Sequence, residues 1–398
     1  MKKLAILSAA VSAVLSQTVS AAVALDPQSV NAEPFRFIPT LAVEARQDDN
    51  IYNASVGEVS STALMISPMF NLVAQDRQNV YAIRYGIRAG LYEESNNNFV
   101  DHTFGVNGHI EPTDRFRFDL GVGYSLLHDD LGTKRTEGTS TATLNTMDPD
   151  EYKQTGINGG FEYGAKEATG QIALTAGYNQ SRYDTAAAKA QYDMDTLNTQ
   201  LEFRYRVAPK TKAILDLEYN DGDYDSQATS LVSDYTERNA LLGVTWESTA
   251  NTTGKLRVGE GKRKNPKGTI SKPIWDLGVQ WSPRDRDQVT FNTMQRFQDG
   301  NGGATMESTT YSAGWSHDWL PRLQSSLNAS WTKDSYQKSA TLPTGRDDDT
   351  MNYGAALNYQ MRRWLVLGTG VSLKDRSSSL AGFDLDRTVF SLNAQISL

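Results

Sequence analysis

Residues 115–124 read RFRFDLGVGY, and this alternation of apolar and polar residues decides the fold. Successive side chains of a strand point to opposite faces, so Phe116, Phe118 and Leu120 share one face while Arg117 and Asp119 share the other. Segments of the same kind recur from about residue 35 to residue 398, without helical patterns that would cover an apolar face. A closed transmembrane barrel, with lipid outside and water inside, satisfies both faces.

The spacing of these segments predicts an all-β, antiparallel barrel of about 18 strands. Short turns and long polar loops alternate between the strands, which is typical of outer-membrane barrels with short periplasmic turns and long extracellular loops. An even number of strands also leaves both chain ends on one side. The predicted strands begin near residues 35, 60, 79, 101, 115, 152, 168, 194, 211, 235, 253, 272, 287, 306, 323, 349, 364 and 385.

Aromatic residues support this orientation. Tyr and Trp favour the membrane interface, because the ring is apolar and its tip is polar. Five of them lie within a few residues of a predicted short turn, on the apolar face: Tyr163, Tyr205, Trp246, Trp281 and Trp319. Trp364 also borders a turn but falls on the polar face, which indicates an error of register at that point.

The N-terminus is typical of a secretory signal. Lys2 and Lys3 precede a mostly apolar run over residues 4–15, and the small residues 22–24 fit a cleavage site. We therefore expect a signal peptide over residues 1–24 and one barrel domain over residues 25–398, in the outer membrane of a Gram-negative bacterium. An uncleaved anchor helix is the alternative.

Composition narrows the function further. The chain has no cysteine, which excludes disulfides and thiolate metal sites. Its formal net charge of -8 argues against nucleic acid as a partner. No cofactor and no metal site are expected.

Charged residues of both signs fall on the polar face of the predicted strands. They either pair across neighbouring strands or form a polar pore wall with a small basic excess, which would favour anionic or polyhydroxylated solutes. The candidates for lining the pore are Arg84, Arg88, Arg115, Arg117, Asp119, Glu202, Arg204, Arg206, Lys212, Asp216, Glu218, Arg257, Asp276, Arg296 and Arg387.

The predicted external loops are mostly acidic. Their spacing fits no calcium-binding loop, so a solvated surface is the simpler interpretation. One segment has the opposite sign: residues 262–267 read KRKNPK, predicted as a loop that is either solvated or holds lipopolysaccharide phosphates or an acidic glycan.

Two other classes of protein, a hydrolase and a soluble propeller, fit the sequence less well. His102 and His128, with Asp101, Asp129 and Asp130 near them, could activate water in a hydrolase. No Gly-x-Ser-x-Gly motif accompanies them, so we expect no enzyme and assign no catalytic residue. A soluble propeller would repeat shorter strands in groups of four with a fixed signature, which is missing from this sequence.

Several short sequence motifs resemble those of one family. Residues 46–52 read RQDDNIY, residues 97–102 read NNFVDH and residues 128–133 read HDDLGT, with Pro68-Met69-Phe70, Tyr85 and Tyr92 between them. In this order they resemble the putative beta-barrel porin 2 family. The chain departs from most barrel proteins in ending on Leu398 instead of an aromatic residue.

The resemblance implies an outer-membrane barrel that helps an exopolysaccharide or capsular polysaccharide cross or reach the outer membrane. Its implied partners are outer-membrane lipid and lipopolysaccharide, the polysaccharide itself and periplasmic export components. The alternatives are a passive diffusion porin for small solutes, anionic ones included, and a structural barrel without transport.

Overall fold

The computed structural model describes residues 30–32, 34–93, 97–225, 233–249, 251–300, 305–338 and 344–397. The predicted signal peptide, residues 1–24, lies outside the described residues, and so does Leu398.

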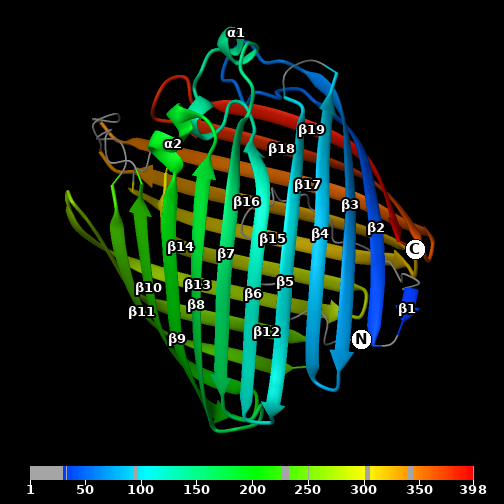
Figure 1. The fold of residues 1–398 in the computed structure, drawn as a ribbon, viewed down its shortest axis with the longest axis vertical. Coiled ribbons are helices and arrows are strands. Elements are labelled where there is room, and N and C mark those ends of the chain that lie inside the picture. The colour runs from blue at the N-terminus through cyan, green and yellow to red at the C-terminus, as the bar shows by residue number, and fades with distance from the viewer. Residues whose placement is uncertain are drawn as a thin grey trace.

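Long antiparallel strands make up most of the described chain (Figure 1). They are 13 to 17 residues long, enough to cross a bilayer at a tilt. The strands are β2 (Phe35–Asp48), β3 (Ser61–Asp76), β4 (Asn79–Tyr92), β5 (Phe99–Thr113), β6 (Phe116–Asp129), β7 (Asp150–Tyr163), β8 (Gly170–Tyr183), β9 (Met194–Ala208), β10 (Thr211–Tyr224), β11 (Tyr235–Thr249), β12 (Thr252–Asn265), β13 (Gly268–Arg284), β14 (Asp287–Asp299), β15 (Thr305–Leu320), β16 (Leu323–Tyr336), β17 (Arg346–Arg362), β18 (Leu365–Ser378) and β19 (Leu385–Ser397).

Pairing of the last strand with the first closes the sheet into a barrel. Each strand from β2 onward pairs with the next, and β19 returns to β2, with Leu392 opposite Ala45. A three-residue strand, β1 (Val30–Ala32), pairs with the start of β2. The predicted barrel of 18 strands is thus confirmed.

Short helical elements occur in the long connections at the upper end in Figure 1: η1 (Lys134–Thr136), α1 (Thr141–Leu144) and α2 (Ala186–Tyr192). Within the described residues, no helix is long and apolar enough to cross a membrane.

The strand starts agree with the sequence prediction to within four residues. The largest difference is at β13, predicted from residue 272 and beginning at Gly268. This difference corrects the basic segment 262–267: β12 continues to Asn265, so only Pro266 and Lys267 form the turn. Lys262, Arg263 and Lys264 lie on a strand and alternate between its two faces.

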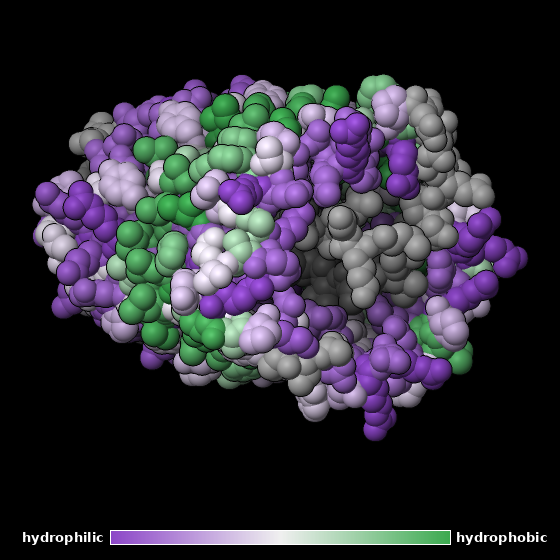
Figure 2. Space-filling view, turned by 90° about the horizontal axis from the view of Figure 1, so that it is seen from below, coloured by the Kyte–Doolittle hydropathy of each residue, from purple (hydrophilic) through white to green (hydrophobic). Residues whose placement is uncertain are grey.

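The apolar face of the strands points outward. Along β6, Phe118, Leu120 and Val122 are 37%, 59% and 51% exposed, values that suit contact with lipid. Seen from the short-turn end, hydrophobic residues gather on the outer flank and hydrophilic residues surround a hollow (Figure 2). Trp364 lies in the turn between β17 and β18. Because it is not part of a strand, it belongs to neither face of the sheet, and its position does not indicate an error of register.

Candidate functional site

Fourteen of the fifteen predicted pore residues lie on strands, on the face opposite the exposed apolar side chains. The exception is Arg115, which lies exposed in the turn between β5 and β6. That correction follows from β6 beginning at Phe116 instead of residue 115. Whether the other fourteen line a permeation path stays a prediction. They are Arg84 and Arg88 on β4, Arg117 and Asp119 on β6, Glu202, Arg204 and Arg206 on β9, Lys212, Asp216 and Glu218 on β10, Arg257 on β12, Asp276 on β13, Arg296 on β14 and Arg387 on β19.

Most of these charges are paired with each other or with a close neighbour. Arg117, only 5% exposed, donates to Glu162 at 2.5 Å and to the Gly164 carbonyl at 2.7 Å. Glu162 also accepts from Arg204 at 3.2 Å, and Arg204 binds Glu202. Cross-strand pairs of opposite charge stabilise neighbouring strands. These residues therefore connect β6, β7 and β9 through ion pairs inside the barrel.

A second network joins β10, β12 and β13. Asp216 is fully buried and accepts from Gln200 on β9 at 2.8 Å and from Arg257. Arg257 also donates to Asp276 at 2.5 Å, and Lys255 reaches the same carboxylate at 2.8 Å. A buried carboxylate needs such partners, because removing it from water is costly.

One pair reaches across the interior. Glu218 on β10 accepts from Arg296 on β14 at 3.2 Å, although three strands separate them along the wall. A Cβ atom at position 259 would lie 1.9 Å from the carbonyl oxygen of Ala240, so only glycine permits this approach of β12 to β11. The pair therefore narrows the lumen on this side.

The remaining predicted residues also have partners. Arg84 donates to Asn71 at 2.9 Å, and Arg88 lies 3.8 Å from Asp101. Asp119 binds the His109 ring at 2.7 Å. The interior is thus rich in charge but largely neutralised locally.

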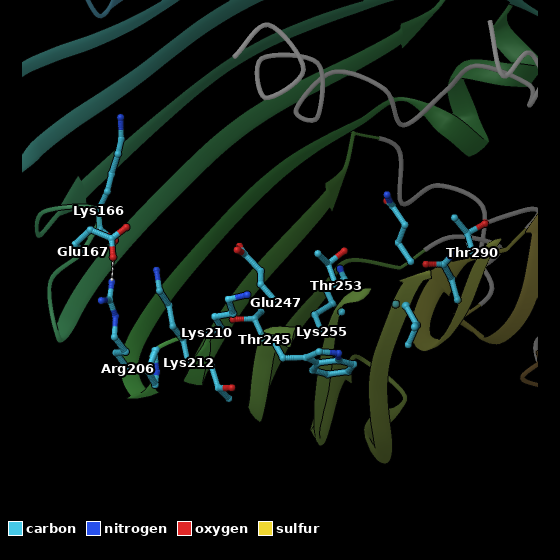
Figure 3. A pocket seen from close by; sticks show the side chains of 18 residues that line it. Lys166, Glu167, Arg206, Lys210, Lys212, Thr245, Glu247, Thr253, Lys255 and Thr290 are labelled. Atoms are coloured by element: carbon cyan, nitrogen blue, oxygen red, sulfur yellow. Dashed lines mark hydrogen bonds and ion pairs between the residues drawn. The ribbon is translucent and has the colours of Figure 1, made fainter. Parts of the chain in front are cut away.

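The short-turn end holds a cavity of about 500 Å³ with an excess of cations. Its side chains come from the β7–β8 and β9–β10 turns and from the ends of β9 to β14 (Figure 3). The charged lining residues are Lys166, Glu167, Arg206, Lys210, Lys212, Glu247 and Lys255, five cations against two carboxylates.

Some of the cations of this cavity are neutralised and others are not. Arg206 donates to Glu167 at 2.8 Å, and Lys166 donates to Glu111 at 2.9 Å. Lys212 instead donates to the neutral amide of Gln171 at 2.9 Å. Lys210 makes no ion pair within the described part of the chain. The Glu247 amide donates to the Lys210 carbonyl at 2.8 Å, so this carboxylate stands opposite Lys210. Lys210 and Lys212 against Glu247 leave a formal charge of +1 at the short-turn mouth.

The opposite end contains a small apolar core made by loops. Ile51 and Tyr52, from the β2–β3 connection, and Leu131 and Leu144, from the β6–β7 connection, are all at most 1% exposed. They pack against Met65 and other inward residues of β3, β4 and β5. Their burial fixes both loops against the inner wall at the extracellular end.

The sequence motifs that carry the family resemblance pack together in this core. Gly132 has φ +79, and a Cβ there would lie 1.5 Å from the Tyr52 carbonyl oxygen. The amide of Leu131 donates to Asn97 at 3.4 Å. Asn50, fully buried, accepts from the Ala54 amide at 2.9 Å and donates to the carbonyls of Ala54 and Asp386. Three separate segments of sequence thus form one packed unit.

The β6–β7 connection also reaches β17 and β18. Glu137 accepts from Arg346 at 3.0 Å and from Arg376 at 2.6 Å. Arg346, whose side chain is 2% exposed, lies 2.5 Å from Asp348 and 4.0 Å from the centre of the Phe383 ring. We call these contacts of Glu137 with Arg346 and Arg376 the loop latch.

The charge state of Glu137 follows from this setting. Burial by itself raises the pKa of Glu137, but the hydrogen bond from Arg346 and the charge of Arg376 outweigh it. The pKa of this carboxyl therefore lies below its ordinary value, and the latch is ionised at neutral pH.

The two histidines considered for catalysis do not converge. The His102 ring bonds to the Tyr85 hydroxyl at 2.9 Å. The His128 ring binds Asp101 at 2.7 Å and Asp130 at 3.1 Å, and it stacks on Phe99 with centroids 3.8 Å apart. His128 thus joins the strand ends to the β6–β7 connection.

Sequence reasoning missed the loop core and the latch. The prediction treated the external loops, the β6–β7 connection among them, as a solvated surface. Only the motifs that resemble the family, in their order along the chain, pointed to these residues. Contacts between distant loops leave no periodic pattern in the sequence.

Comparisons with known proteins agree with this geometry. The family model described as putative beta-barrel porin 2 matches residues 24–398. The fold is similar to that of OccK1 (OpdK) of Pseudomonas aeruginosa, with a TM-score of 0.50 and 11% identity over 91% of this chain and 99% of that chain. OccAB3 of Acinetobacter baumannii, at 10% identity over 92% of this chain and 99% of that chain, and OprD of Pseudomonas aeruginosa, at 12% over 91% and 95%, both have TM-scores of 0.49.

No curated protein matches the chain. At these identities the solved structures show the fold alone, an outer-membrane barrel, whereas the family model spans almost the whole sequence. The chain is therefore a porin-like barrel of the outer membrane and belongs to the putative beta-barrel porin 2 family.

Proposed function

We propose that the protein is a passive diffusion porin that favours small anionic solutes. The observation that carries this proposal is the excess of positive charge at the short-turn mouth, where Lys210 and Lys212 make no ion pair and face one carboxylate, that of Glu247. Elsewhere in the interior, opposite charges pair and largely cancel. An uncompensated positive charge at one mouth raises the local concentration of anions and their rate of entry.

Solute uptake into liposomes tests this proposal. Gluconate, glucose and glucosamine have similar sizes and differ in charge, so their relative rates report selectivity. We expect gluconate to enter fastest and glucosamine slowest. The K210Q/K212Q variant should lose this order, while the control K189Q/K333Q, which removes two cations from the other end of the barrel, should keep it. Equal rates for the three solutes through the wild type would contradict the proposal.

Polysaccharide export, which the family resemblance implies, receives less support. No described feature points to a polymer path, and the loop core and latch pack against the inner wall where a polymer would leave. Export stays a prediction of the resemblance. A deletion strain with reduced surface polysaccharide, restored by the wild type, would favour export over passive diffusion.

A further inference from the structure

A group of cations lies on the outer surface of the barrel, near its extracellular end. Arg238 on β11 and Lys262 on β12 are direct register partners, and Lys264 follows on the same face. The next pair toward the centre of the membrane is Ala240 with Glu260, followed by Leu242 with Val258, which are 64% and 52% exposed. The cations therefore stand directly beyond the lipid-facing apolar belt.

These cations exceed the carboxylates around them. Lys262 lies 3.3 Å from Glu260, whereas Arg238 faces the Tyr219 ring at 6.0 Å. Lys264 makes no ion pair with any described residue. Asp221, on the neighbouring strand, accepts from the Thr236 hydroxyl at 2.8 Å. Asp223 lies beyond Asp221 on the same face of β10. With Lys267 in the adjacent turn, four cations stand against three carboxylates, a formal balance of +1.

Other outward cations near this end lie beside carboxylates. Arg182 lies 2.8 Å from Asp195 and 3.1 Å from Asp225, and Lys153 lies 3.2 Å from Asp184. Lys333 stands opposite Asp349 in the register of β16 and β17. The basic patch on β11 and β12, formed by Arg238, Lys262 and Lys264, therefore differs from these other outward sites.

An apolar groove runs beside the basic patch. It holds about 480 Å³ and is lined by Leu201, Leu217, Tyr219 and Ala240, with Arg238, Lys262 and Glu260 at its charged end. A groove of this kind fits an acyl chain, and the adjoining cations fit an anionic head group. Together they suit a molecule that carries both.

We propose that lipopolysaccharide binds here, with its lipid A phosphates on the basic patch and one acyl chain in the groove. Arginine and lysine recognise phosphate through charge-assisted hydrogen bonds. The long-loop end of the barrel faces the outer leaflet, which is where lipopolysaccharide presents its phosphates just above the acyl chains. The site is separate from the lumen and does not depend on the proposed transport.

Lipid A binding to the purified, refolded barrel tests the proposal, with bound lipid counted by native mass spectrometry. Each cation near an anionic lipid surface strengthens binding roughly fivefold. The variant R238Q/K262Q/K264Q loses three cations, so it should bind lipid A on the order of a hundredfold more weakly than the wild type. The matched control R182Q/K153Q/K333Q also removes three outward cations near this end and should bind as the wild type does. Heat-modifiable migration on a gel confirms that each variant is folded.

Two further comparisons separate the head group from the chain. Lipid A without phosphates should bind the wild type as weakly as phosphorylated lipid A binds the triple variant. A240W, which fills the groove and keeps the charges, should also weaken binding. The proposal is overturned if the control variant loses as much affinity as the triple variant, if phosphatidylglycerol binds as tightly as lipid A, or if A240W binds normally.

Discussion

At the scale of single residues, Asp48 shows how one carboxylate holds a loop to the barrel. It is fully buried, lies 2.5 Å from Arg387 and accepts the Asn50 amide at 3.1 Å. Arg387 in turn donates to Asn53 at 3.0 Å. The sequence identified Arg387 as an inward cation but could not identify its partner, because 339 residues separate the two along the chain.

Asp48→Asn should therefore loosen the β2–β3 connection. Breaking a buried ion pair by neutralising one partner costs about 3 kcal/mol or more, because the other charge is left uncompensated. Hydrogen exchange of the amides of Asn50 and Ala54 should accelerate accordingly. Asp49→Asn changes an exposed neighbour and serves as the control; equal acceleration in both variants would contradict the role given to Asp48.

Depth in the membrane should decide the effect of charges on the outer face. Leu120 and Val100 are 59% and 58% exposed, but Leu120 lies within the lipid-facing apolar stretch of β6, between Phe118 and Val122, and Val100 at the outer end of β5. Leu120→Arg should destabilise the barrel by about 2–4 kcal/mol and Val100→Arg by about 1 kcal/mol or less. The free energy of unfolding in lipid vesicles measures both, and equal losses would contradict the depths assigned to Leu120 and Val100 in the membrane.

At the scale of elements, the strands were predictable and the long connections were not. The alternation RFRFDLGVGY is a local pattern, so it located β6 to within one residue. The β6–β7 connection has no such pattern, and its position depends on contacts with residues more than 200 positions away. Arg263 illustrates the same limit: predicted in a loop, it is 3% exposed on β12 and bound to Glu237 and Asp299.

The latch should respond to acid. Because the pKa of Glu137 is lowered, its contribution to loop docking is complete above the ordinary pKa of the carboxyl, 4.5, and is lost as the pH falls through the lowered value. We expect the conductance of the barrel to rise and become noisier in that acidic range. Glu137→Gln should show this behaviour already at neutral pH.

The neighbouring substitution Asp148→Asn serves as the control for the latch, since Asp148 is an exposed carboxylate of the same connection. It should leave the pH profile of the wild type unchanged. A Glu137→Gln channel that keeps the wild-type profile would show that the latch does not control conductance.

At the scale of the whole molecule, the barrel combines a neutralised interior with a basic mouth and an extracellular end partly filled by loops. Periodicity predicted the closure, the strand number and the outward apolar face. It also predicted which side chains point inward, yet it could not decide between paired charges and a charged pore wall. That decision depends on distances such as the one between Glu218 and Arg296, which strand spacing alone does not fix.

The reversal potential of single channels in a planar bilayer, under a steep KCl gradient, tests the central proposal most directly. We predict the sign that corresponds to faster passage of chloride, moved toward zero in the K210Q/K212Q variant and unchanged in K189Q/K333Q. A wild-type channel that prefers potassium, or a barrel that conducts no ions, would contradict the account.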